Sequence, residues 1–204
     1  MYILWIRHGY SFGNYSYQFN LDIDVSDAEL TERGWDQSET LWPQIKDIIK
    51  DFNIKPINII FTSTLSRAIQ TSLAISSSES ANGVIVIPLP FITEIPYNNS
   101  YNISKNLYEI NGGNELKILE NTNPYTNDGT PKYPEPNIEL FYTLVIPNII
   151  DDLINKGYKI NKNSVIFIVS HGNLINKITD QKVNNNGMIL QQVNIINNKV
   201  IVGD

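Results

Sequence analysis

The feature of this 204-residue chain that most constrains its fold is a set of four short apolar runs, each rich in Ile and Val and each ended by polar or turn residues. Such runs are typical of buried β-strands. They occupy residues 2–6, 58–61, 84–88 and 165–169. Because strands that alternate with helical segments form parallel sheets with helices on both faces, we predict an α/β fold, a three-layer sandwich around a mostly parallel central sheet.

The segments between the strands have helical patterns. In residues 30–52, large apolar side chains recur at helical spacing, Thr31 is a suitable N-cap, and Pro43 predicts a bend. Residues 66–78 and 138–156 are predicted as two further helices, the second interrupted by a proline.

The remaining segments are less regular. Residues 188–202 carry two asparagines between apolar stretches, which predicts a β-hairpin. Residues 96–137 are rich in Asn, Pro, Gly and Tyr without a sustained period, so we predict a loop or lid excursion over the surface, with one short helix. The asparagine run 184–186 is interpreted as a solvated loop. We expect residues 1–204 to form a single domain.

Composition excludes several functional classes. The chain has no cysteine, which removes disulfides, thiol nucleophiles and cysteine-ligated metals. Its formal net charge is −6 and its lysines are scattered, so we do not expect nucleic acid as a partner. The first apolar run reaches Arg7 too early for a signal peptide, and no later run is long enough to cross a membrane. We therefore expect a cytoplasmic protein without a membrane partner, and leave a homodimer open.

The chemistry is indicated by the placement of a few charged and imidazole side chains. The chain has two histidines, His8 and His171, and each follows an apolar strand and precedes a glycine. Arg7 precedes the first histidine, Arg67 lies near the start of the helix after the second strand, and Glu94 follows the third strand. Because ligands of parallel sheets bind beyond the carboxyl ends of the strands, we expect these groups to converge at one edge.

Such a group of side chains suits a phosphoryl group. Two guanidinium groups bind phosphate through planar paired donors, and a neutral imidazole at His8 can attack phosphorus. The helix starting at Gly172 adds backbone N–H donors, and a protonated Glu94 can supply the proton for the leaving oxygen. Neither a metal nor a cofactor is required. Taken singly, a histidine after a strand is more often structural, and Arg67 or Glu94 could be surface charges; their joint placement favours a site.

Four motifs around these residues resemble those of the histidine phosphatase superfamily, which also holds the cofactor-dependent phosphoglycerate mutases. RHGYSFGN at residues 7–14 matches RHGxxxxN, and LTERGWDQ at 30–37 is similar to LTxxGxxQ. STLSRAIQT at 63–71 matches SxLxRAxQT, and VSHGN at 169–173 contains the second His-Gly pair. The motifs occur in family order over most of the chain. The resemblance implies a phosphoglycerate mutase-like fold.

The resemblance also implies roles for single residues. His8 is the phosphorylated nucleophile, and Glu94 falls where the proton donor is expected. The phosphate-binding residues are Arg7, Asn14, Arg67 and His171. Two departures from the family pattern are present: Tyr10 replaces an acidic residue, and the segment after Glu94 lacks the continuation typical of the mutases.

We favour a phosphatase that hydrolyses a phosphomonoester, either a small molecule or a phosphopeptide, through a phosphohistidine. The alternative is a bisphosphoglycerate-dependent phosphoglycerate mutase, which must bind a second anionic group. The excursion supplies only lysines for that purpose, namely Lys105, Lys117 and Lys132. A third hypothesis, a non-catalytic phosphate-binding protein, predicts a missing nucleophile or ligand, and all are present. An aromatic substrate could stack on tyrosines, although packing explains most of them, among Tyr97, Tyr101, Tyr108, Tyr125 and Tyr133.

Overall fold

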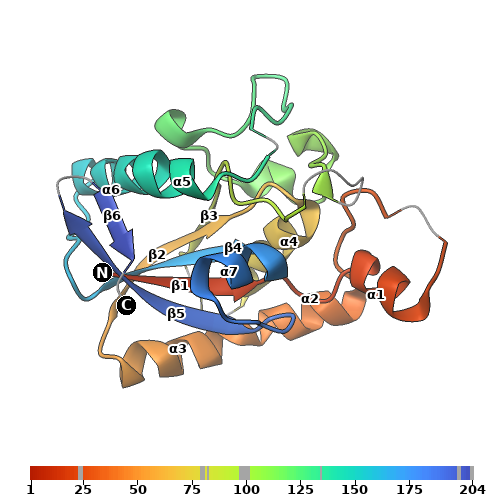
Figure 1. Ribbon diagram of the computed structural model, residues 1–204, viewed down its shortest axis with the longest axis horizontal. Helices are drawn as coiled ribbons and strands as arrows, with labels where there is room; N and C mark the ends of the chain where they lie inside the picture. Colours follow the sequence, from red (N-terminus) through yellow and green to blue (C-terminus); the bar gives the residue numbers. More distant parts are fainter. Residues whose placement is uncertain are drawn as a thin grey trace.

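The central element of the computed structural model is a six-stranded sheet with strand order β3-β2-β4-β1-β5-β6 (Figure 1). The structure describes residues 1–22, 25–78, 81, 83–96, 102–133, 135–196 and 199–202. Four strands are parallel: β1 (Tyr2–Arg7), β2 (Lys55–Thr62), β3 (Ile85–Pro88) and β4 (Ser164–Ser170). The antiparallel strands at one edge are β5 (Met188–Ile196) and β6 (Lys199–Val202).

The four predicted strands are confirmed, and so is the hairpin, whose two connecting asparagines lie outside the described residues. β2 begins at Lys55, earlier than the predicted residue 58. The sequence did not indicate this start because the first two residues of the strand are exposed. In the register of β1 and β4, Arg7 pairs with Ser170. His8 and His171, the next residues along each strand, therefore leave the sheet side by side.

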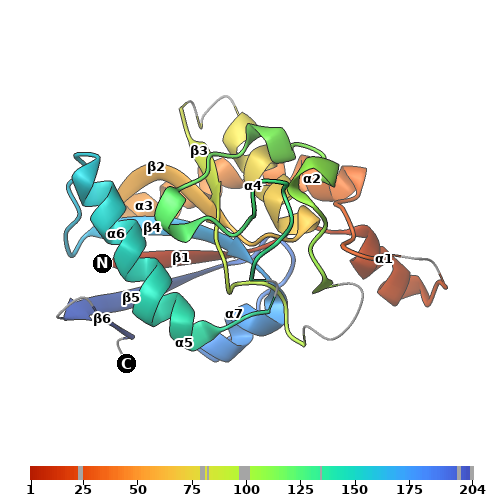
Figure 2. The same ribbon diagram turned by 90° about the horizontal axis from the view of Figure 1, so that it is seen from above.

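Helices cover both faces of the sheet, which confirms the three-layer α/β sandwich. Alternate side chains of β1 point to opposite faces, with Ile3 on one and Leu4 on the other. The first face packs against α6 (Ile146–Asn155) and α7 (Gly172–Thr179). The second packs against α3 (Leu41–Asp51) and α4 (Ser66–Ser77). In Figure 1, α6 lies above the sheet and α3 below it, and Figure 2 looks down on the side of α6.

The segment 30–52 forms two helices instead of one bent helix. Thr31 caps α2 (Glu32–Glu39), as predicted, by accepting a hydrogen bond from the Gly34 amide. The chain then breaks at Thr40 before α3 begins. Pro43 lies in the first turn of α3, where a missing N–H costs little, so the break precedes the proline.

The predicted helix 138–156 is helical but irregular. It consists of α5 (Ile138–Leu140), a π-helical turn η6 (Phe141–Val145) and α6. The interruption precedes Pro147, whose ring nitrogen cannot donate to the carbonyl four residues earlier. Within the described chain, none of the helices is long and apolar enough to cross a membrane.

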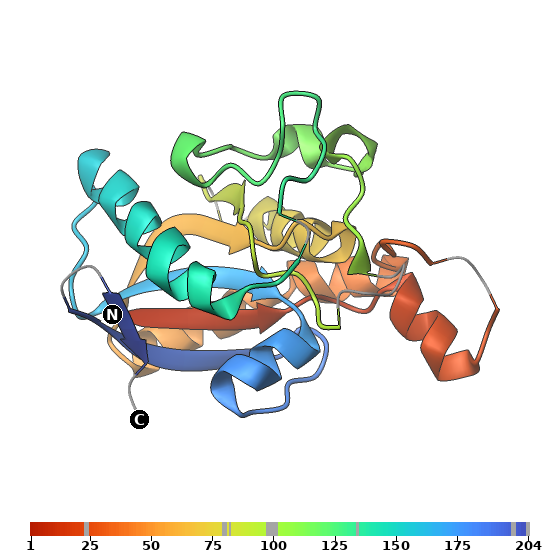
Figure 3. The ribbon, with the colours of Figure 1, turned by 45° about the horizontal axis from the view of Figure 1, so that its top comes forward.

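A further helix, α1 (Phe12–Phe19), was not predicted. Ser11 and Asn14 form a capping box at its start, but its exposed face carries aromatic side chains, so no apolar period marks it. In Figure 3, α1 projects from the carboxyl end of the sheet, far from the N-terminus.

The excursion after β3 packs more closely than predicted. Its described residues include three short 3₁₀ turns, η3 (Leu107–Glu109), η4 (Gly113–Glu115) and η5 (Glu120–Thr122), where one short helix was expected. Leu107 and Tyr125 are buried with other apolar residues against Ile69 and Leu73 of α4. Figure 3 shows this segment above α4. The apolar residues are spaced irregularly because 3₁₀ turns and loops impose no repeat.

Candidate active site

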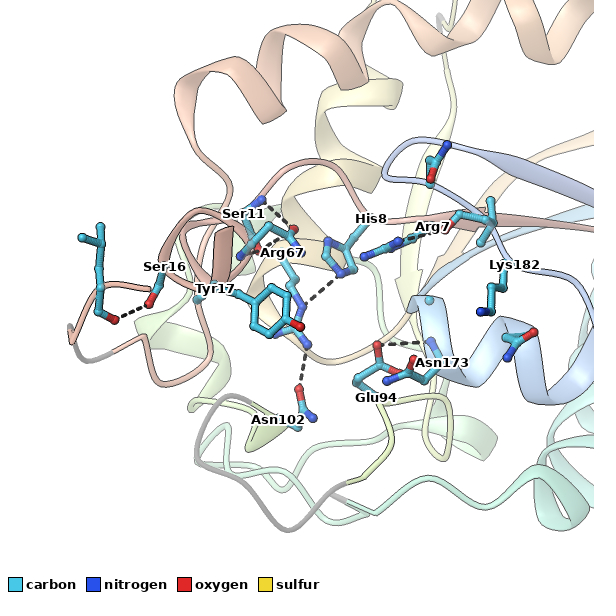
Figure 4. A pocket seen from close by; sticks show the side chains of 18 of the residues that line it. Arg7, His8, Ser11, Ser16, Tyr17, Arg67, Glu94, Asn102, Asn173 and Lys182 are labelled. Atoms are coloured by element: carbon cyan, nitrogen blue, oxygen red, sulfur yellow. Dashed lines mark hydrogen bonds between the residues drawn. The ribbon is translucent and has the colours of Figure 1, made fainter. Parts of the chain in front are cut away.

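A cavity of about 750 Å³ opens beyond the carboxyl ends of β1 and β4 (Figure 4). Its walls include most of the predicted site residues, namely Arg7, His8, Asn14, Arg67, Glu94 and Gly172. His171 is not part of the wall. It lies behind His8, with 5.2 Å between the two ring centroids.

His8 is held as a neutral imidazole. Its Nδ1 lies 2.7 Å from the carbonyl oxygen of Gly9, which can only accept, so Nδ1 carries the proton and Nε2 carries the lone pair. Burial lowers the pKa of His8 well below its ordinary value of 6.5, and the charges of Arg67 and Arg7 lower it further. The ring therefore presents an unprotonated nitrogen.

Arg67 is buried at the start of α4 and reaches both His8, in the loop that follows β1, and the excursion. Its Nε donates to Nε2 of His8 at 3.3 Å, and its Nη2 donates to Oδ1 of Asn102 at 2.9 Å. Asp27 fixes the same helix start by accepting from the amide and hydroxyl of Ser66 at 2.8 and 2.9 Å. Asn102 and Asp27 were both missed from the sequence, since neither lies in a recognisable motif.

Side chains of the motif at residues 63–71 hydrogen bond to the backbone of the motifs at 7–14 and 30–37. Thr71 Oγ1 accepts a hydrogen bond from the Gly9 amide at 2.9 Å, and Gln70 Oε1 accepts one from the Leu30 amide at 2.8 Å. Added bulk at Gly9 would collide with Ser38 of α2, because a Cβ there would lie 2.6 Å from its Oγ. The loop after β1, which carries His8 and Gly9, is therefore held between α2 and α4.

His171 is fully buried and forms the N-cap of α7. Its Nε2 hydrogen bonds with the hydroxyl of Ser63 at 2.8 Å, and its Nδ1 is buried without a partner among the described residues. Burial lowers its pKa well below the ordinary value, with Arg67 as the next cause. His171 is therefore also neutral, and its buried Nδ1 lacks, within the described chain, the hydrogen-bond partner that such an atom usually has.

Arg7 lies flat against the start of α7. Its Nη1 donates to the carbonyl of Val183 at 2.8 Å. A Cβ on Gly172 would lie 3.0 Å from the guanidinium carbon of Arg7, so the glycine permits this approach. The second His-Gly pair thus makes room for the arginine of the first.

Glu94 lies at the N-terminus of α7. Its Oε1 accepts from the amides of Ile95 at 2.9 Å and Leu174 at 3.1 Å, and its Oε2 accepts from the amide of Asn173 at 3.4 Å. Burial raises the pKa of Glu94 from its ordinary 4.5, although these amides and Arg67 oppose the shift. Two other acids of the excursion are exposed and outside the cavity wall, Glu109 and Glu115.

The asparagine run 184–186 is not a solvated loop. Asn185 Nδ2 donates to the carbonyls of His8 at 3.0 Å and Gly9 at 3.1 Å, and to Oδ1 of Asn14 at 3.1 Å. The Asn14 oxygen also accepts from the amide of Ser11, so its amide nitrogen is the group available to a ligand. Asn185 therefore links the loop after β1 to the start of α1. The described residues contain no cluster of three or more His, Asp or Glu that could hold a metal.

A family model of the histidine phosphatase superfamily, branch 1, matches residues 3–201. The chain belongs to this superfamily. The four motifs predicted this membership, and the match confirms it.

Solved structures of the same fold include several phosphatases. Mycobacterial hydrolase 1 matches with a TM-score of 0.53 at 12 % identity, over 100 % of this chain and 97 % of that chain. The ecdysone phosphate phosphatase of Bombix mori, in complex with tungstate, has a TM-score of 0.53 at 14 % identity, over 100 % and 92 %. The alpha-ribazole phosphatase of Shigella flexneri has a TM-score of 0.51 at 16 % identity, over 100 % and 95 %. None of the curated proteins matches the chain.

One departure of the chain from the family pattern, Tyr10, lies outside the cavity wall. The Tyr10 side chain donates to Gln18 and its ring lies 6.0 Å from the Arg33 guanidinium carbon, so it does not line the wall. Its carbonyl oxygen would lie 2.0 Å from a Cβ on Gly34, which explains the glycine of the second motif. Lys182, which the sequence did not indicate, lines the cavity, whereas the three lysines of the excursion do not.

Proposed function

We propose that the chain is a phosphatase that hydrolyses a phosphomonoester through a covalent phosphohistidine on His8. The observation that carries the proposal is the hydrogen-bond geometry of the His8 ring. Its proton is on Nδ1, bonded to the Gly9 carbonyl at 2.7 Å, so the lone pair of Nε2 can attack phosphorus. The lowered pKa keeps the ring neutral at neutral pH.

The arginines bind the phosphoryl group. The bond from Arg67 Nε to His8 Nε2 is long, at 3.3 Å, and its acceptor is neutral. A phosphoryl oxygen is a stronger acceptor, so Arg67 turns to the substrate and frees Nε2. Arg7 and the amides at the start of α7 bind the other oxygens. His171 is buried behind His8 and does not line the cavity, so its unpartnered Nδ1 could reach the phosphoryl group only after a local rearrangement.

In the first step, His8 Nε2 bonds to phosphorus while the bond from phosphorus to the leaving oxygen breaks. Glu94 in its acid form, which burial favours by raising its pKa, gives its proton to that oxygen and becomes a carboxylate. The imidazole now carries a positive charge, which the bond from Nδ1 to the Gly9 carbonyl stabilises.

In the second step, the Glu94 carboxylate takes a proton from a water molecule as its oxygen bonds to phosphorus. The bond between phosphorus and Nε2 then breaks, inorganic phosphate leaves, and His8 and Glu94 return to their initial states. Glu94 is suited to both proton transfers because burial raises its pKa while amides of α7 hold its charged form.

Lys182 is the one observation that favours the mutase alternative, because it adds a cation to the cavity wall. A single exposed lysine is a point charge and binds an anion more weakly than an arginine pair. Incubation with a monophosphoglycerate, with and without the bisphosphate, separates the activities. Phosphate release faster than isomerisation supports the phosphatase, and the reverse supports the mutase.

The phosphohistidine itself is tested by rapid quench with a radiolabelled phosphomonoester. We expect label on the protein that is stable in base and labile in acid. His8→Ala should remove both label and turnover while circular dichroism stays unchanged. Label and turnover that survive in His8→Ala would refute the proposed mechanism.

A further inference from the structure

The cavity has an apolar side that the phosphoryl chemistry does not use. Tyr17 and Leu21, from α1 and the residues after it, line that side together with Ala28, and Lys182 lines the cavity elsewhere. Figure 4 shows the Tyr17 ring pointing into the cavity on the side of Arg67, away from Lys182. Tyr17 therefore places an aromatic ring in the wall of the same cavity that contains His8.

The Tyr17 side chain is 91 % exposed, although it belongs to a cavity wall. An aromatic ring in water gains free energy when another flat apolar group covers it. No hydrogen bond from the Tyr17 hydroxyl is found within the described part of the chain, so its ring and hydroxyl are both available to a ligand.

Helix α1 holds this ring in a defined place. Asn14 belongs to the capping box that starts the helix, and Asn185 donates to its Oδ1 at 3.1 Å. At the other end, the Ser16 hydroxyl donates to the Leu21 carbonyl at 2.9 Å. Tyr17 is therefore carried by a helix that is capped locally at its end and fastened to the Asn185 loop at its start, which is the kind of support that a selective contact needs.

We propose that Tyr17 stacks on an aromatic ring of the substrate, so that the preferred substrate is a small phosphomonoester whose alcohol carries such a ring. The inference rests on the proposed phosphatase activity. A phosphoryl group fills only a small part of a cavity of about 750 Å³. That volume is typical of sites for small molecules, roughly 300–1,000 Å³.

Of the tyrosines considered from the sequence, Tyr97 and Tyr101 lie outside the described residues, and the other three do not compete for this role. Tyr125 is buried against α4, and Tyr108 and Tyr133 lie outside the cavity wall. A competing explanation comes from α1 itself, where Phe12 and Phe19 are exposed and do not line the cavity. If α1 were an interface with a second copy, replacing Tyr17 would change the oligomeric state instead of substrate choice.

The test compares phenethyl phosphate with ethyl phosphate, whose leaving alcohols are similarly basic, so that the ring is the main difference. We expect Tyr17→Ala to lower the ratio of kcat/KM for phenethyl over ethyl phosphate roughly two- to tenfold. The loss should appear as a higher KM for the phenethyl ester, because stacking acts before and during the reaction. Tyr17→Phe keeps the ring and should restore the ratio.

The matched control is Tyr15→Ala, a tyrosine of the same helix that does not line the cavity. It should leave the ratio at the wild-type value. An unchanged ratio in Tyr17→Ala, with both esters hydrolysed, would overturn the inference and leave the phosphatase proposal standing. A changed molecular mass in light scattering, with an unchanged ratio, would assign α1 to a dimer interface. A wild-type protein that hydrolyses neither ester would overturn the phosphatase proposal and this inference with it.

Discussion

The residues of the site reach it in two different ways: His8 and His171 by strand register, and Asn185 by the path of a loop. His8 and His171 directly follow two neighbouring parallel strands, so the strand register alone brings them together. Asn185 lies on the loop between α7 and β5, and the fold returns it to the carbonyls of His8 and Gly9. Asn102 reaches Arg67 in the same indirect way, from the excursion.

The comparison separates residues that perform chemistry from residues that hold them. The groups at the strand and helix ends are charged or can exchange protons, as phosphoryl transfer requires. Asn102 and Asn185, which loops supply, are neutral amides; they satisfy backbone carbonyls and guanidinium N–H groups without changing the charge of the site. Replacing a group of the first kind should slow the chemical step, and replacing a group of the second kind should loosen the geometry of the site. Three predictions test this distinction.

The largest effect is expected at Glu94, a chemical group. Glu94→Gln keeps the shape but cannot transfer a proton, so the rate on an alkyl phosphate should fall roughly 10²–10⁴-fold. The nitrophenolate leaving group hardly needs a proton, so the rate of p-nitrophenyl phosphate hydrolysis should fall much less. This holds as long as formation of the phosphohistidine, and not its hydrolysis, limits the rate. Steady-state and burst kinetics of both substrates measure the difference.

Equal and small losses on the two substrates would show that Glu94 is not the acid. Glu109→Gln serves as the control, because this residue belongs to the same excursion but is exposed and outside the cavity wall. A loss in Glu109→Gln that depends on the substrate would transfer the role to that residue.

The pH dependence should be smaller and should come from the same chemical groups. Burial raises the pKa of Glu94 above 4.5, so its acid form is lost, and kcat/KM for an alkyl ester falls, as pH rises through that raised value. Burial lowers the pKa of His8 well below 6.5, so its neutral form persists in acid. We expect kcat/KM to fall roughly tenfold per pH unit above the raised pKa of Glu94, and to be retained below it as long as His8 stays neutral.

In Glu94→Gln, the part of the alkaline fall that belongs to the carboxyl group should disappear, and the ionisation of the substrate should remain. A profile of Glu94→Gln identical in shape to that of the wild type would assign the fall to the substrate alone.

Apolar patterns predicted the layers of the fold well because each pattern reflects burial on a face of the sheet. β4 is buried along its whole length, and its apolar run was correspondingly clear. α1 was missed because its large side chains are exposed and not packed on the sheet. The excursion was judged too irregular for a core, since its buried residues Leu107 and Tyr125 come from separate turns.

Predictability of the site followed the same division. His8 and Arg67 lie beside regular elements, and their convergence could be argued from strand order and helix position. Asn102, Asn185 and Asp27 could not be found, because any of many asparagines and aspartates in this chain could have met the site. Long-range loop contacts have no local pattern, so only the folded structure identifies them.

The smallest effect is expected at Asn185, a holding group, and it should differ in kind from the effect at Glu94. Asn185→Ala removes one amide that donates to the carbonyls of His8 and Gly9 and to Asn14. Loss of these partly buried contacts should cost about 1 kcal/mol of unfolding free energy, or about 2–4 °C in Tm for a chain of this size. Asn155→Ala, at the exposed end of α6, is the matched control and should leave Tm unchanged.

The rate of Asn185→Ala should fall roughly tenfold or less, since a nucleophile loop with fewer restraints samples the attacking geometry less often. Because the amide takes no part in proton transfer, alkyl and p-nitrophenyl esters should lose the same factor, and the pH profile should keep its shape. Thermal unfolding and kinetics on both esters, measured on the same preparations, decide between the two kinds of group. If the loss depended on the leaving group, or if Tm stayed at the wild-type value while the rate fell, Asn185 would act on the chemistry directly and the division between chemical and holding groups would be wrong.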